Sequence, residues 1–234
     1  MRIGIGTKIV IEAGDQQQIL EQFPVRGFQS SVDYQLHFGL GNYQEALNLY
    51  KKSLGIRNKL IDSSGIAALY NKIGLVYQNT FKMDSAIFYA TKALKIYKAQ
   101  KNLKYVVALK NNIANIHKGL KQYEKALESH LEIALINEKI NDTIPLIRSY
   151  NNIGNAYLFL KDTANCILYY KKGITLAEAK NYNKMLASLY NNYGGVLHSK
   201  KRFTEAKNMV NKSLDLRKKL NDNYGIASTS LHLA

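Results

Sequence analysis

The sequence of 234 residues contains only two prolines, one cysteine and no long apolar run. Because proline breaks the interior of a helix, its scarcity favours helix along the whole chain. The single cysteine, Cys166, excludes an internal disulfide framework and a zinc site built from cysteines. No stretch reaches the roughly 18 apolar residues of a membrane-spanning helix, and residues 9–11 are too short for the core of a signal peptide. We therefore expect a soluble chain in the cytoplasm.

The chain is strongly basic, with a formal net charge of +16 at pH 7. Such a balance raises the question of nucleic acid or an anionic membrane surface as a partner. The distribution of charge weakens that interpretation, because the five lysines of residues 108–147, in the middle of the chain, are balanced by five acidic residues. An unbroken basic stripe is not expected, and nucleic-acid binding is kept as an alternative function.

One short segment recurs at a fixed interval. Tyr-Asn-Asn-Ile-Gly-Asn-Ala-Tyr at 150–157 has near-copies at 70–77, 110–117 and 190–197, each 40 residues from the next. A fixed period of this length indicates an array in which each unit buries its apolar face on its neighbours. We expect a poorly specified leader over 1–27 and an array over 28–234, with units at 28–67, 68–107, 108–147, 148–187 and 188–227 and a sixth, truncated unit from 228.

Each unit is predicted to hold two helices. In the second unit, an apolar face over 68–78 is followed by a turn at 80–82 and a second helix from Asp84 to Ala99. Small residues recur at one site of the second helices, where they allow close helix approach: Ala46, Ala86, Ala126, Cys166 and Ala206. Larger apolar residues recur further along and are expected to form the core between repeats: Ile56, Ile96, Ile136, Leu176 and Leu216.

The ends of the helices and the leader also carry local signals. Polar residues between units are expected to supply loops and N-caps for the next hairpin: Asp62, Asn102, Asp142, Asn181 and Asp222. In the leader, isoleucines beside glycines suggest a short extended segment over residues 3–11. Residues 15–23 are predicted to form two helical turns that stop before Pro24.

The repeated pattern resembles the tetratricopeptide repeat. It combines aromatic-x-x-Ile-Gly-x-x-Tyr with Tyr-x-x-Ala, as in Tyr123 and Ala126, and a small-Leu pair, Ala93-Leu94. The 40-residue units resemble the longer repeats of Leu-Gly-Asn-type adaptors, kinesin light chains and bacterial sensor and regulator proteins. The resemblance implies an all-α fold, a right-handed superhelical solenoid of antiparallel helix hairpins. It also implies a scaffold without enzymatic activity that binds a protein or peptide in its concave groove, as the sensory or adaptor part of a longer regulatory protein.

In the resembled fold, the first helix of each hairpin lines the groove, and its groove-facing sites hold asparagine here in unit after unit: Asn71, Asn111, Asn151 and Asn191, with Asn115 and Asn155 at a second site. A carboxamide can pair with both the C=O and the N–H of a peptide backbone. We expect Lys118 and Arg148 to bind a ligand carboxylate, Phe159 to give an apolar anchor and His198 to add selectivity. In the alternative interpretation the asparagines bond one another and tie the repeats together.

Other recurring residues give no sign of catalysis. Charged residues recur on the second helices and are interpreted as a solvated outer face: Lys52, Lys92, Glu132, Lys172 and Lys212. His37 and His117 occupy the register of Tyr77 and Tyr157, which favours packing, and no His pair flanks a glutamate as in a zinc helix. We expect no metal, no cofactor and no small-molecule substrate, and a buried, inert Cys166. Homo-oligomerisation through exposed end repeats is a further alternative.

Overall fold

The computed structural model describes residues 7–13, 16–22 and 42–230. In these residues a two-stranded hairpin precedes ten helices. The helices are α2 (Tyr43–Lys59), α3 (Ser63–Asn79), α4 (Met83–Ala99), α5 (Leu103–Gly119), α6 (Tyr123–Lys139), α7 (Thr143–Phe159), α8 (Thr163–Ala179), α9 (Asn183–Ser199), α10 (Phe203–Lys219) and α11 (Asn223–Ser230). Each of them begins 20 residues after the previous one, so a pair of helices repeats every 40 residues, as the sequence period predicts.

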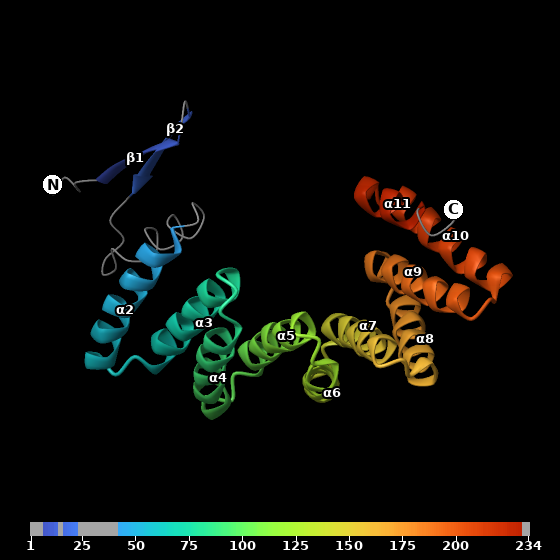
Figure 1. Ribbon diagram of the computed structural model, residues 1–234, viewed down its shortest axis with the longest axis horizontal. Helices are drawn as coiled ribbons and strands as arrows, with labels where there is room; N and C mark the ends of the chain where they lie inside the picture. Colours follow the sequence, from blue (N-terminus) through green and yellow to red (C-terminus); the bar gives the residue numbers. More distant parts are fainter. Residues whose placement is uncertain (1–6, 14–15, 23–41, 231–234) are drawn as a thin grey trace.

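The helices form a curved array (Figure 1). Each helix packs mainly on its neighbours in sequence, and α7 also contacts α9, the first helix of the following pair. The predicted helical solenoid is therefore confirmed. In the part of the chain that the structure describes, no helix is both long and apolar enough to cross a membrane.

Three-residue turns connect consecutive helices, and the middle residue of each turn is left-handed, with φ between 51° and 61°. These middle residues are Ile61, Phe81, Lys101, Lys121, Asn141, Lys161, Asn181, Lys201 and Asn221.

The residue after each left-handed residue is the N-cap of the next helix. Three of the predicted caps accept a hydrogen bond from the backbone three residues on: Asp62, Asn102 and Asp222. Asp142 holds a cap position without such a bond, and Asn181 lies in the left-handed position, one residue before the cap Tyr182.

The small residues of the second helices are buried as predicted, since none of the five is more than 4 % exposed. The first helices approach these sites closely. A Cβ at Gly154 would lie 2.5 Å from the ring of Tyr170, and one at Gly74 would lie 3.2 Å from the carbonyl oxygen of Ala86. The paired helix therefore leaves no room for a side chain at Gly154 unless Tyr170 moves, and only a tight fit at Gly74.

The predicted core between repeats is wrong in part. Ile56 is 55 % exposed, and its counterparts Ile96, Ile136, Leu176 and Leu216 are half-buried. On α4 the fully buried positions are Ala86, Ala90, Ala93 and Tyr97. These four residues follow the helical period and form one stripe, and residue 96 lies about 100° around the helix from residue 97. The isoleucines therefore flank the core stripe.

The leader contains a strand where the sequence predicts helical turns. Strand β1 (Thr7–Ala13) confirms the extended segment for the residues that the structure describes, and β2 (Gln16–Gln22) replaces the helix expected over 15–23. The strands pair antiparallel, with Ala13 opposite Gln16 and Thr7 opposite Gln22. Two residues, Gly14 and Asp15, separate them in sequence, and a Gly-Asp dipeptide between two such runs is a hairpin signal. His37 and the first helix expected in unit 28–67 lie outside the described residues.

Candidate functional site

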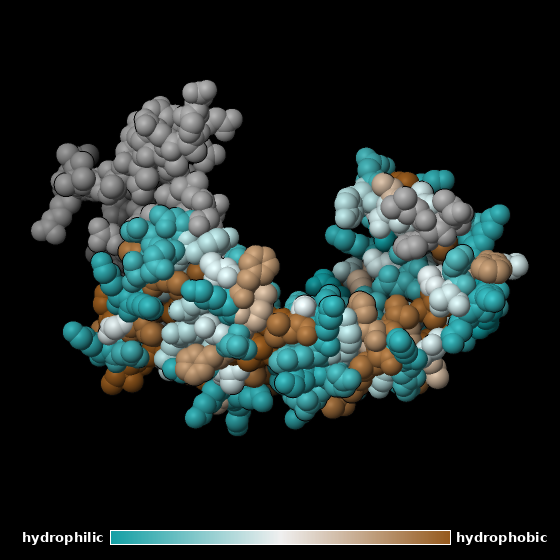
Figure 2. Space-filling view, viewed as in Figure 1, coloured by the Kyte–Doolittle hydropathy of each residue, from teal (hydrophilic) through white to brown (hydrophobic). Residues whose placement is uncertain are grey.

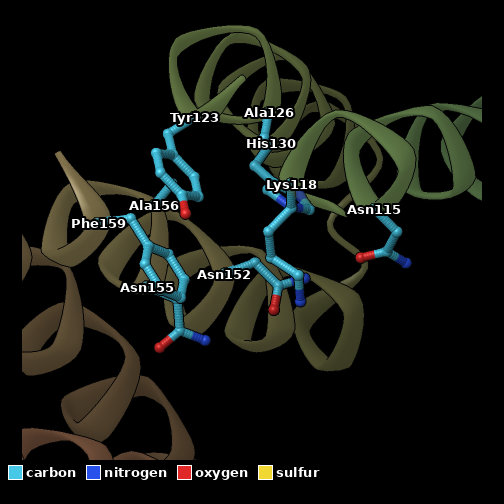
Figure 3. A pocket seen from close by; sticks show the side chains of 9 residues that line it. All are labelled: Asn115, Lys118, Tyr123, Ala126, His130, Asn152, Asn155, Ala156 and Phe159. Carbon is cyan, nitrogen blue, oxygen red and sulfur yellow. The ribbon is translucent and has the colours of Figure 1, made fainter. Parts of the chain in front are cut away.

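Two adjoining hollows lie along α5, α7 and α9, the first helices of three successive pairs. The first, called here the α5–α7 pocket, is lined by the residues that Figure 3 labels: Asn115, Lys118, Tyr123, Ala126, His130, Asn152, Asn155, Ala156 and Phe159. The second, the α7–α9 groove, encloses about 950 Å³ and its lining includes Asn155, Leu158, Asn191, Asn192, Gly195, His198, Phe203 and Lys207. Asn155 lines both, so the two hollows adjoin at this residue. Figure 2 shows hydrophilic residues interspersed with apolar ones over the surface of the array.

An aromatic pair and a lysine line the α5–α7 pocket. The rings of Tyr123 on α6 and Phe159 on α7 stack with centroids 4.8 Å apart and planes 8° from parallel. Phe159 is 49 % exposed, so its other face can contact a ligand. Lys118, on the last turn of α5, is exposed and brings a positive charge to the same pocket (Figure 3).

His130 is the buried polar residue of this pocket. It is 4 % exposed, and its Nδ1 atom has no hydrogen-bond partner. Burial, aided by the positive charge of Lys118, lowers the pKa of the imidazole from 6.5 to about 4. The ring is therefore neutral at pH 7, which leaves one nitrogen as a donor and the other as an acceptor.

Three carboxamides form a network between the first helices α7 and α9. The Nδ2 atom of Asn192 donates to Oδ1 of Asn151 at 2.9 Å and contacts Oδ1 of Asn155 at 3.4 Å. The hydroxyl of Tyr170, on α8, donates to the same Asn155 oxygen at 2.6 Å. Asn151 is only 7 % exposed. Here the asparagines bond one another between repeats, as in the alternative interpretation from the sequence.

The predicted site residues fall into two groups. Six of them line the hollows: Asn115, Lys118, Asn155, Asn191, Phe159 and His198. The other four line neither hollow. Asn71 is half-buried on α3 and Asn151 belongs to the network. Asn111 donates to the carbonyl oxygen of Val107 on its own helix, and Arg148 donates to the hydroxyl of Tyr182.

Sequence reasoning did not single out several residues of the hollows: Tyr123, His130, Asn152, Asn192, Phe203 and Lys207. Asn152 and Asn192 carry a signal that could have found them, since each is the second residue of the Asn-Asn pair that recurs with the repeat. Tyr123 and Phe203 hold the first position of a second helix, where Tyr123 begins the Tyr-x-x-Ala pattern that indicates the fold.

Neither metal binding nor a reactive thiol is indicated in the described part of the chain. No group of three or more His, Cys, Asp and Glu residues there could hold a metal ion. Cys166 is completely buried on α8, as expected, and burial raises the pKa of its thiol to about 11.

Family models of the tetratricopeptide repeat match residues 35–99, 147–180 and 187–220, more than half of the chain. The chain belongs to the tetratricopeptide repeat family. A model described as ASPIC and UnbV matches residues 1–50, which overlap the predicted leader and the start of the array.

One curated relative is transcriptional activator NprA of Geobacillus stearothermophilus, 24 % identical over 80 % of this chain and 46 % of that protein. The chain spans about half the length of the curated relatives it matches. Among solved structures, the apo form of RapI is 20 % identical, covers 84 % of this chain and 55 % of that one, and has a TM-score of 0.78. A Rap protein complexed with competence and sporulation factor is 17 % identical, covers 84 % of this chain and 55 % of that one, and has a TM-score of 0.64. Repeats of a putative kinesin light chain of Podosopora anserina are 13 % identical, cover 81 % of this chain and 93 % of that one, and have a TM-score of 0.67.

Proposed function

We propose that this protein binds an extended segment of a peptide or a partner protein along α5, α7 and α9. The observation that carries the proposal is the row of carboxamides in the two adjoining hollows, contributed by Asn115, Asn152, Asn155 and Asn191. Asn115 and Asn152 can each accept from a backbone N–H and donate to a backbone C=O. The oxygen of Asn155 already accepts from Tyr170 and Asn192, so Asn155 contributes its amide donor. Such a row can hold an extended chain with little regard to its sequence.

The charges of the hollows favour an acidic segment. Lys118 lines the α5–α7 pocket and Lys207 lines the α7–α9 groove. Of the described residues that line the two hollows, none is an aspartate or a glutamate. A carboxylate of the ligand would therefore meet positive charge and amide donors without a like charge in the lining, which favours binding and speeds encounter.

Three similar proteins support this function. The Rap protein whose fold the chain resembles was solved in complex with competence and sporulation factor, and a Rap conjugation regulator was solved in complex with the Phr* peptide. NprA is a transcriptional activator and is about twice as long as the region that matches this chain. By analogy, we infer that the array is the sensory or adaptor part of a regulatory protein.

The test is a binding screen of the purified chain against immobilised random-sequence peptides. Asn115→Ala combined with Asn191→Ala removes two carboxamides from the row, and Asn208→Ala combined with Asn211→Ala is the control, since both are exposed on α10 and line neither hollow. We expect binding to weaken at least about tenfold in the first double variant, as each lost hydrogen bond is worth about 1 kcal/mol.

Equal binding by the parent and the two double variants would place the ligand elsewhere on the molecule. If the parent binds no peptide, the proposed function is wrong. RNA binding whose affinity falls steeply with salt would then favour the nucleic-acid alternative, and sedimentation that depends on concentration would favour self-assembly.

A further inference from the structure

The second groove-facing position, which holds Asn115 and Asn155 in earlier repeats, is a glycine in α9. At the register held by Leu75, Asn115 and Asn155 in the preceding repeats, α9 has Gly195, which lines the α7–α9 groove. A Cβ built at Gly195 would meet nothing within 4 Å. Its neighbour Gly194 differs, because a Cβ there would lie 2.9 Å from Val210. Packing therefore explains Gly194 and does not explain Gly195.

Glycine in the interior of a helix is destabilising relative to alanine, and none of the described residues excludes a side chain at this position. What the glycine provides is open space in the groove. The walls beside that space are apolar: Leu158 on α7 is 41 % exposed and Phe203 on α10 is 57 % exposed. The ring of His198 meets that of Phe203 at 67°, with centroids 5.2 Å apart, and orients this wall.

We propose that Gly195 determines the side-chain specificity of the α7–α9 groove, which receives one bulky apolar side chain of an extended acidic segment. This inference rests on the proposed function. Asn191 and the amide donor of Asn155, whose oxygen already accepts from Tyr170 and Asn192, contact the backbone of the segment. The apolar side chain enters the space above Gly195 between Leu158 and Phe203.

Charge decides between possible occupants of the groove. Lys207 lies in the groove, Lys118 lies in the adjoining pocket, and the described lining of both carries no carboxylate. A second copy of this chain, with its net charge of +16, is repelled from such a surface. An acidic segment of another protein is attracted to it. The occupant is therefore a peptide segment with a carboxylate close to its large apolar residue.

The test fills the space without disturbing the fold. Gly195→Leu places a side chain in the groove, and Gly55→Leu is the matched control, because Gly55 lies inside helix α2 and its Cβ would also meet nothing within 4 Å. Both changes replace a helical glycine, so we expect the thermal midpoint of each variant to equal or exceed that of the parent. If Gly195→Leu does not fold, Gly195→Asn, which restores the residue of the preceding repeats, serves in its place.

We expect the parent to select peptides with Leu, Met or Phe close to an acidic residue from a positional library. Gly195→Leu should weaken the affinity for the best peptide at least about tenfold, because burying one large apolar side chain contributes about that much. Gly55→Leu should leave the affinity for the same peptide unchanged. Replacing the apolar residue of that peptide by alanine should weaken the parent complex and have little effect on the Gly195→Leu complex, since the two changes act on one contact.

Three outcomes would overturn the inference. Additive effects of the two changes would mean that the peptide side chain lies elsewhere. Binding that depends on Asn115 and Asn191 but shows no preference for an apolar residue would retain the proposed function and reject the role of Gly195. A parent chain that binds no peptide would reject both.

Discussion

Lys110 on α5 and Glu132 on α6 form an ion pair at the position where two other repeats place a lysine against a tyrosine. In those repeats the Nζ atom of Lys92 lies 5.4 Å from the ring centroid of Tyr70, and that of Lys212 lies 5.4 Å from the ring centroid of Tyr190. The lysine-rich row of the outer helices therefore makes contacts within the array, beyond the solvated face that the sequence indicates. Glu132 interrupts this row because its partner is a lysine.

We predict that Glu132→Lys destabilises the protein by about 3 kcal/mol, because it leaves the buried Lys110 without its partner and beside a like charge. The side chain of Lys110 is only 9 % exposed. The double variant Lys110→Tyr with Glu132→Lys should recover most of the loss by forming the pair seen at Tyr70 and Lys92. Urea unfolding measures each free energy. Additive losses in the double variant would show that the two sites are independent.

The left-handed turn at Ile61 offers a stabilising substitution. Ile61 has φ of 54° and is 87 % exposed, and its β-branched side chain is poorly suited to this conformation. Asparagine holds the same place at Asn141, Asn181 and Asn221. We expect Ile61→Asn to stabilise the protein by about 1 kcal/mol, measured as a rise in the urea midpoint. The reverse change, Asn181→Ile, should lower the midpoint; a fall in both variants would contradict the conformational explanation.

Acid should destabilise the fold through His130. Its pKa is about 4 in the folded protein and about 6.5 when unfolded, so between these values the unfolded chain binds the proton more readily. The free energy of unfolding therefore falls as the pH drops from about 6.5 to about 4, by at most about 3 kcal/mol. The variant His130→Tyr introduces the residue that holds the same position in the next repeat, Tyr170. In this variant, this part of the pH dependence should disappear. The exposed His198→Gln variant is the control and should keep it.

Cys166 should resist modification in the folded protein. Its thiol is completely buried and its raised pKa of about 11 keeps it protonated at neutral pH, whereas alkylation requires an accessible thiolate. An alkylating reagent at pH 8 should therefore leave the native chain unlabelled and label it once in urea, as read by mass spectrometry. Rapid labelling without denaturant would show that α8 opens locally.

Two errors show where sequence patterns stop being sufficient. Residues 15–23 read as helical turns only if the hairpin signal at Gly14-Asp15 is given no weight, and residues 16–22 form a strand because β1 supplies backbone partners along their whole length. Ile56 reads as core because it recurs with the repeat, but it is exposed, whereas its four counterparts pack half-buried against the core. Recurrence marks a shared position and does not state how far a neighbouring helix covers it. Both outcomes depend on a neighbouring element.

The sequence alone determined the period, the helix pairs, the turns between them and the small residues where helices meet, because each of these follows from local propensity and from contacts repeated in every unit. Only the tertiary structure decided the roles of the asparagines. Asn115 is exposed, Asn151 is buried, and both belong to the row predicted from the sequence. Asn192 of the next repeat bonds to the buried Asn151, and the accessibility of a side chain depends on what the adjoining helix places against it.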